Sequence, residues 1–293
     1  MPSRPTTLLM VSLLVLLLVG AAGCANQAAA DHKYMTHERL QNGLVIILPG
    51  IEGRGVLSQA VRTGLVDANI NQGLRYYDWG WPVPVAGLVL NQMDTNRARK
   101  QAAKLALIIQ EYQGQYPGRP VHMVGHSGGA AVAVFAAEQL PEGSVIDGVI
   151  MLRPSLSVGY DLSKALNHTC KGIVNFWSPA DVALLMVGTT VFGNLDGVHG
   201  PAGGAMGFIR PSDSSKAELL HQFAWSMDQI LTGNLGGHFT VAASSFVKEW
   251  VAPWIQVRDW PAESQQPTLN TQPAASEPDS APSQSAPAAG KAE

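Results

Sequence analysis

Five consecutive residues, Gly125-His126-Ser127-Gly128-Gly129, have the types and spacing of a nucleophilic site. An apolar run at 121–124 precedes them and a small-residue segment at 130–140 follows, which predicts a strand, a sharp turn and a helix. On such a turn the serine hydroxyl is raised above the end of a sheet. Glycine is required at positions 125 and 129 because a side chain would collide across the turn. We therefore expect Ser127 to be a nucleophile.

A serine hydroxyl attacks poorly at neutral pH unless a histidine takes its proton and a carboxylate orients that histidine. Asp181 follows an apolar run at 172–177 after three intervening residues, and His238 lies on a glycine loop ahead of the predicted final helix. We expect these two side chains to complete a triad with Ser127. Asp196 and His199 are the alternatives for the acid and the base.

The other histidines have structural roles in this interpretation. His122, His168 and His221 lie within or beside predicted strands, where a lone histidine is usually a satisfied core residue. His126, inside the motif, is expected to pack or to bond locally. The two remaining histidines precede the predicted domain.

Attack on an acyl group also requires N–H donors for the oxyanion that develops. The N–H of Gly128 follows the nucleophile and heads the predicted helix, so it is one candidate. The second is expected in the loop after the first strand, where Ile51 is preferred and Glu52 is the alternative.

These residues must be positioned by a regular scaffold, and the chain alternates apolar runs with helical patterns. Such alternation predicts a parallel sheet covered by helices on both faces, with function at the carboxyl ends of the strands. The predicted strands are 44–48, 74–79, 121–124, 147–152, 172–177 and about 219–225. The predicted helices are about 54–65, 95–112, 130–140, 160–167 and 239–250.

The loop residues Gly50-Ile51, the motif around Ser127, and Asp181 and His238 in this order resemble the α/β-hydrolase superfamily across residues 44–258. The resemblance implies a mostly parallel, twisted sheet of about eight strands with helices on both faces. It also implies esterase, lipase, thioesterase or peptidase activity on a small-molecule acyl substrate, with no metal and no organic cofactor. The chain departs from many relatives in having Pro49-Gly50 where they have His-Gly.

The N-terminus has the features of an export signal rather than of the fold. Arg4 precedes an apolar stretch, Leu8–Val19, which is too short to span a bilayer comfortably. Cys24 follows small residues, as in a bacterial lipobox, although Ala21 stands where Leu is usual. We expect cleavage before Cys24, acylation of that residue, and a membrane-anchored lipoprotein of the bacterial cell envelope. Cys170 then has no disulfide partner and is expected to be a small packing residue.

Composition bounds the rest of the chain. Of its 293 residues 46% are hydrophobic and 14% charged, which suits one domain with a deep core. The net charge of −3 gives no support to nucleic-acid binding, and the residues after Trp260 account for all of it. The predicted layout is a signal peptide at 1–23, a tether at 24–43, the hydrolase domain at 44–258, and a disordered tail rich in Pro, Ala, Ser and Gln at 259–293.

The substrate is the least determined feature. Only about eight residues follow the strand 147–152 before the next helix, so a large lid is not expected there. The long glycine-rich segment 185–215 is expected either to form an apolar rim over the site or to be a plain surface loop. The competing function classes are a non-catalytic lipoprotein with the same fold and a surface anchor that acts through its tail.

Overall fold

A computed structural model describes residues 31–80, 94–181 and 193–260. Their centre is one sheet of six strands, all parallel, in the order β2-β1-β3-β4-β5-β6. The strands are β1 Leu44–Leu48, β2 Gly73–Tyr76, β3 Val121–His126, β4 Ile146–Leu152, β5 Thr169–Trp177 and β6 Leu220–Ala224. Each predicted strand is therefore present, and the α/β class is confirmed.

The strand number differs from the expectation of about eight. Within the described ranges the sheet has six strands, and β1 is the first of them in the order of the chain. Ahead of β1, residues 31–34 are helical, and α2 (His37–Gln41) follows, so this stretch adds no strand.

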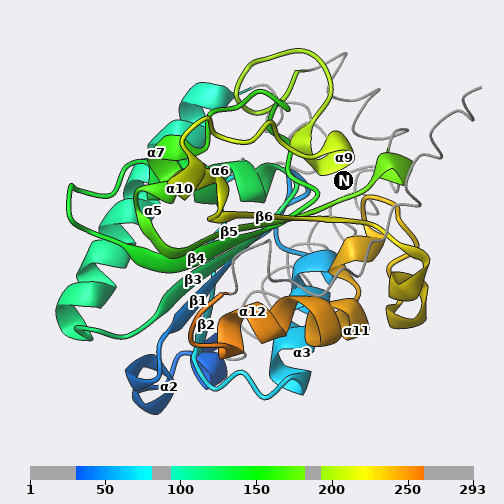
Figure 1. Cartoon of the computed structure of the whole chain (residues 1–293). Helices are drawn as coiled ribbons and strands as arrows, with labels where there is room; N and C mark the ends of the chain where they lie inside the picture. Colours follow the sequence, from blue (N-terminus) through cyan, green and yellow to red (C-terminus); the bar gives the residue numbers. More distant parts are fainter. Residues whose placement is uncertain (1–30, 81–93, 182–192, 261–293) are drawn as a thin grey trace, which may run out of the picture.

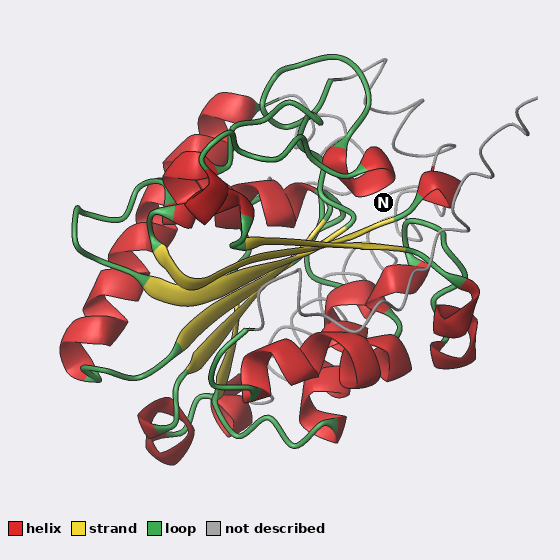
Figure 2. Cartoon of the chain, in the orientation of Figure 1, coloured by secondary structure: helices red, strands yellow, loops and turns green. Residues whose placement is uncertain are grey.

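Helices cover both faces of the sheet, as Figures 1 and 2 show. One layer contains α5, α6 and α7, and the other contains α3, α11 and α12. Their bounds are α3 Val56–Asp67, α5 Thr95–Gln115, α6 Gly128–Ala137, α7 Ser163–Leu166, α11 Ser244–Phe246 and α12 Ala252–Gln256, with a π-helical turn, η5 Val247–Val251, between the last two. The predicted final helix is thus broken and shifted toward the C-terminus.

Short elements complete the described chain around the strand ends. They are the 3₁₀ turns η1 Pro179–Asp181, η3 Met227–Thr232 and η4 Thr240–Ala242, and the short helices α9 Gly203–Met206 and α10 Ser214–Ala217. None of the helices in the described ranges is both long and apolar enough to cross a bilayer.

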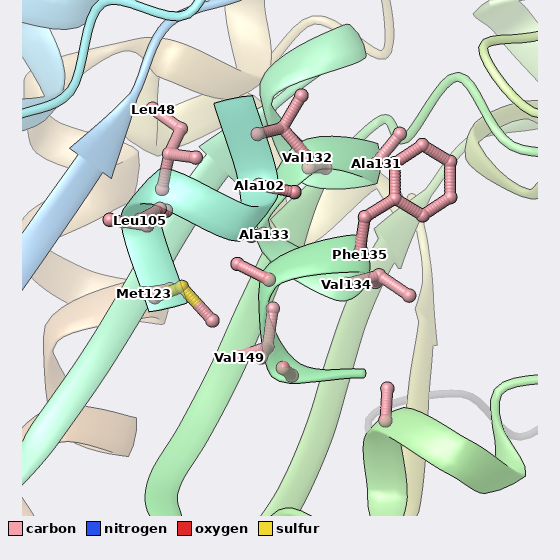
Figure 3. Packing of buried hydrophobic residues seen from close by; sticks show 14 of the residues in the cluster. Leu48, Ala102, Leu105, Met123, Ala131, Val132, Ala133, Val134, Phe135 and Val149 are labelled. Atoms are coloured by element: carbon pink, nitrogen blue, oxygen red, sulfur yellow. The ribbon is translucent and has the colours of Figure 1, made fainter. Parts of the chain in front are cut away.

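Helix α6, which begins directly after Ser127, is buried along its whole length. Figure 3 shows its side chains between α5 and the sheet, with Ala102 and Leu105 on one side and Met123 and Val149 on the other. Alanine, glycine and valine dominate α6, and such small side chains let it lie close to the strands on one side and to α5 on the other. This packing fixes the start of α6 and therefore the position of Ser127.

Part of the expected tether is attached to the domain. Arg39 of α2 donates to the carbonyl oxygens of Ile70 at 2.7 Å and Gln72 at 3.0 Å. Asp31 forms ion pairs with Arg54 and with Arg62 of α3. These contacts hold residues 31–42 beside the edge of the sheet that carries β2. The predicted signal peptide, Cys24 and the tail from residue 261 lie outside the described residues.

Candidate active site

Ser127 occupies the turn between β3 and α6 in a strained backbone conformation. Its φ of 53° and ψ of −121° lie in a region that non-glycine residues rarely adopt, and its N–H donates to Leu152 O at 3.0 Å. A Cβ on Gly125 would come within 2.5 Å of Ala130 Cα, and one on Gly129 within 2.2 Å of Pro49 O. The two flanking glycines are therefore required by backbone contacts, as the sequence predicted.

Asp181 and His238 are in direct contact although they are 57 residues apart. His238 Nδ1 lies 2.8 Å from Asp181 Oδ2, and both side chains are buried. A carboxylate only accepts, so Nδ1 carries the proton and Nε2 is left with a free lone pair. Burial lowers the pKa of His238, and the bond to Asp181 opposes that change. The pair thus has the tautomer and the charge state of a general base.

His238 contacts the turn that carries Ser127 by way of His126, the residue before Ser127. Its ring lies 4.9 Å from the ring of His238, centroid to centroid, and its Nε2 donates to His238 O at 3.0 Å. Among the described residues no hydrogen bond joins Ser127 to His238. Catalytic hydrogen bonds often form fully only when substrate binds. Without substrate, the contact of His126 with His238 is what connects the loop of the base to the turn that carries Ser127.

The loop after β1 lies over the start of α6. A Cβ on Gly128 would come within 3.1 Å of Ile51 Cγ2 and 2.9 Å of the Trp79 ring, so Ile51 and Trp79 both lie against Gly128. Trp79 is buried and donates from Nε1 to Pro49 O at 2.8 Å. The two predicted oxyanion donors are therefore on adjacent segments, and Trp79 supports the loop after β1.

The side chain of Glu52 turns back onto this site. Glu52 Oε1 accepts from Gly50 N at 3.2 Å and lies 3.4 Å from His126 Nδ1. Burial acts to raise the pKa of Glu52, but the contacts with His126 and with backbone N–H groups outweigh it and the pKa is lowered. Glu52 and His126 thus connect the loop after β1 to the loop that carries the base. Sequence reasoning missed this connection because it joins residues 52, 126 and 238.

The alternatives for the acid and the base lie elsewhere. Asp196 Oδ2 accepts from Ser157 Oγ at 2.5 Å, and the ring of His199 lies beside Gly193. His122 and His221 are buried within the sheet, as predicted, but His122 is not a satisfied core residue, because neither of its ring nitrogens has a hydrogen-bond partner among the described residues. Cys170 differs from the prediction: it is exposed because it precedes the buried part of β5, and its thiol pKa is raised by partial burial and by Asp147.

The segment expected to form an apolar rim divides into buried and exposed parts. Leu195 and Phe208 pack into the core, whereas Met206 is exposed. Met186, Val191 and Phe192 lie outside the described residues. The loop that carries His238 also exposes apolar side chains, because Leu235 is 61% exposed and Phe239 is 51% exposed. Sequence reasoning did not single out these residues.

Arg153 is the most unusual residue near the dyad, and the sequence analysis did not identify it. It directly follows β4, has a φ of 50° and is fully buried. Its Nε lies 3.9 Å from Asp181 Oδ2. No local pattern in the sequence separates a buried arginine from the exposed ones, but its position directly after a central strand was a usable signal.

The comparisons with known proteins agree with this fold. A family model described as "Alpha/beta hydrolase" matches residues 74–167, which include Ser127. Lipase B of Aspergillus fumigatus aligns with a TM-score of 0.50 at 14% identity, over 79% of this chain and 57% of the lipase. No curated protein matches the chain.

Two further solved structures align less closely. Dienelactone hydrolase from Anabaena variabilis has a TM-score of 0.41 at 13% identity, over 73% of this chain and 85% of that chain. Est1E from Butyrivibrio proteoclasticus has a TM-score of 0.42 at 13% identity, over 75% of this chain and 91% of Est1E. The six-stranded parallel sheet, the strained serine turn and the family match together give the chain the α/β-hydrolase fold and support its place in that superfamily.

Proposed function

We propose that this protein is a serine hydrolase that cleaves carboxylic esters through a Ser127–His238–Asp181 triad and an acyl-enzyme intermediate. The observation that carries the proposal is the buried Asp181–His238 pair, which lies against the strained turn of Ser127 through His126. An imidazole with its Nδ1 proton held by a carboxylate and its Nε2 free is what activation of a serine requires.

In the first half of the reaction Ser127 Oγ attacks the carbonyl carbon of the ester while its proton passes to His238 Nε2. Asp181 stabilises the imidazolium that forms. The carbonyl oxygen becomes an oxyanion, for which Gly128 N–H and Ile51 N–H are the proposed donors. The tetrahedral intermediate then collapses, and the leaving alcohol takes the proton from Nε2. Ser127 is left as an acyl ester.

In the second half water attacks that acyl ester and gives a proton to the same Nε2. Collapse of the second tetrahedral intermediate releases the carboxylic acid, and the proton returns to Ser127 Oγ. The enzyme is regenerated with no change of oxidation state, and each step uses groups that the dyad and the turn supply.

An apolar acyl group is the substrate class that the surroundings of the base favour. Phe239 is half exposed and its ring lies 5.4 Å from the His238 ring, and Leu235 on the same loop is exposed as well. Apolar surface beside a reacting centre binds an acyl chain by removing it from water. We therefore expect turnover to rise with acyl chain length from acetate to medium chains.

We also propose that the enzyme acts at a membrane of the bacterial cell envelope. Cys24, after an apolar stretch and small residues, is the expected site of acylation. Several acyl chains on one residue hold a protein on a membrane far more firmly than one chain does. Residues 24–30 would then be a short connection to the helical segment that begins at residue 31.

Hydrolysis of p-nitrophenyl esters of increasing chain length tests the proposal. Ser127→Ala and His238→Gln should each lower kcat/KM by about 10⁴-fold. His199→Gln is the matched control for the base and should change kcat/KM by less than about two-fold. No hydrolysis by the wild type, or equal hydrolysis by Ser127→Ala, would contradict the proposal. The first of these outcomes would favour a non-catalytic lipoprotein with this fold.

A further inference from the structure

A fully buried arginine lies behind the proposed triad. Arg153 follows β4 directly, and its N–H donates to Phe176 O of β5 at 3.0 Å. Its side chain has 0% exposure. Its φ of 50° is a left-handed conformation that is unfavourable for a residue with a Cβ. The backbone therefore holds this side chain inside the protein in a strained geometry.

The guanidinium bridges the acid and the loop that carries the base. Its Nε lies 3.9 Å from Asp181 Oδ2, the same oxygen that accepts from His238 Nδ1. Its Nη2 donates to Asn234 Oδ1 and to Gly236 O, each at 3.4 Å. Gly236 is two residues before His238. Arg153 thus contacts the acid of the dyad directly and the loop that carries the base two residues before His238.

The guanidinium of Arg153 makes too few hydrogen bonds for its burial to be explained by a contribution to the stability of the fold. Among the described residues, Nε and Nη1 have no hydrogen-bond partner. Burial lowers the pKa of Arg153 to about 10, although Asp181 raises it. A buried ion pair with long, incomplete contacts is often no more stable than an apolar replacement. A strained, buried and poorly bonded arginine indicates a role in function.

We propose that Arg153 is a positioning residue that fixes Asp181 against His238 and limits the basicity of His238. The inference rests on the proposed function, because it assigns Arg153 an effect on the proton acceptor of that reaction. It adds a residue to the site that is not a member of the triad and does not touch the ester.

The charges that face His238 give the direction of the effect. Asp181 and Glu52 favour the imidazolium form of His238, whereas His126 opposes it. The described ion-pair contacts add one further charge at the dyad, the cation of Arg153 on Asp181. Without that cation the carboxylates of Asp181 and Glu52 favour the imidazolium form of His238, and only His126 opposes it. His238 would therefore bind a proton more readily. The guanidinium lies 3.9 Å from Asp181 Oδ2, a distance at which an opposite charge shifts the pKa of its partner by about one unit or more, and its effect on His238 is transmitted through Asp181.

The pH dependence of kcat/KM tests this proposal. The substrate is a p-nitrophenyl ester, and kcat/KM is measured from about pH 5 to 8 to follow the acid limb. Arg153→Gln keeps a donor for Asn234 and Gly236 but removes the charge, and the acid limb of its profile should move up by about one pH unit. Arg153→Lys retains the charge and should return the limb toward that of the wild type. Arg99→Met removes a half-exposed cation that pairs with Glu138, and it should leave the limb in place.

A second measurement separates an electrostatic role from a structural one. The His238 Cε1–H chemical shift is followed by NMR as pH changes in wild type and Arg153→Gln, which reports protonation without turnover. An upward shift of that titration supports the proposal even where the variant has lost activity. An unchanged titration midpoint or an unchanged acid limb overturns it, as does an equal shift in Arg153→Lys. If Arg153→Gln does not fold, Arg153→Met takes its place with the same expected direction. An inactive wild type contradicts the proposed function itself, so the two failures are distinguishable.

Discussion

His122 should make the protein acid-labile, and replacing it by leucine should remove part of that lability. The residue lies in β3 with no solvent exposure, and neither ring nitrogen has a hydrogen-bond partner among the described residues. Burial, with a contribution from Lys171, lowers its pKa from 6.5 to about 3. Between about pH 6.5 and pH 3, His122 is therefore neutral in the folded protein but protonated in the unfolded chain.

The sign and the size follow from proton linkage. Because the folded pKa is depressed, the unfolded state binds the extra proton below pH 6.5, and stability falls with falling pH until about pH 3. Between about pH 7.5 and 4.5 this one side chain should lower the free energy of unfolding by about 3 kcal/mol, close to two pK units. A folded pKa one unit higher changes that figure little, because pH 4.5 would still lie above it.

Urea unfolding followed by tryptophan fluorescence at these two pH values measures the effect. The wild type should lose about 3 kcal/mol more between the two pH values than His122→Leu does. His32→Leu is the control, because His32 is exposed and its ring stays in solvent in both states. Equal pH dependence of His122→Leu and the wild type would refute the reasoning.

Three further predictions concern the site and the anchor. Gly129→Ala should lower kcat at least about 10²-fold with an unchanged far-UV spectrum, because its Cβ would meet Pro49 O and displace the oxyanion loop; normal turnover would sink this idea. Asp181→Asn should lower kcat about 10⁴-fold while Asp196→Asn changes it little, and the reverse ranking would make Asp196 the acid. Cys24→Ala should move the protein from the membrane fraction to the soluble fraction, and an unchanged distribution would contradict lipidation at this residue.

The scaffold could be read from the sequence because its signals are local. The runs around Leu44–Leu48 and Ile146–Leu152 are apolar throughout, which is typical of strands buried on both faces. The spacing of apolar residues in α5 likewise indicates which side of that helix is buried. The small apolar residues of α6 indicate a helix that is buried on all sides. The final helix was misplaced because a π-helical turn and Pro253 interrupt it, and neither changes the apolar pattern that was used.

The site was predictable only in part. Ser127, Asp181 and His238 each follow a strand in the order that the fold resemblance implied, and the structure places the last two in contact. The contacts of His126 and Arg153 could not be predicted, since His126 meets Glu52 and His238, and Arg153 meets Asp181 and Asn234, all of them on other loops. A pattern over neighbouring residues cannot report which loops meet at the edge of the sheet.

The central claim is that Ser127 is a nucleophile activated by His238. The most direct test is to treat the wild type with a fluorophosphonate, digest it, and locate the added mass by peptide mass spectrometry. We expect one modification, on Ser127, with labelling slowed by orders of magnitude in His238→Gln. A label on another residue, or equally fast labelling of His238→Gln, would contradict the account.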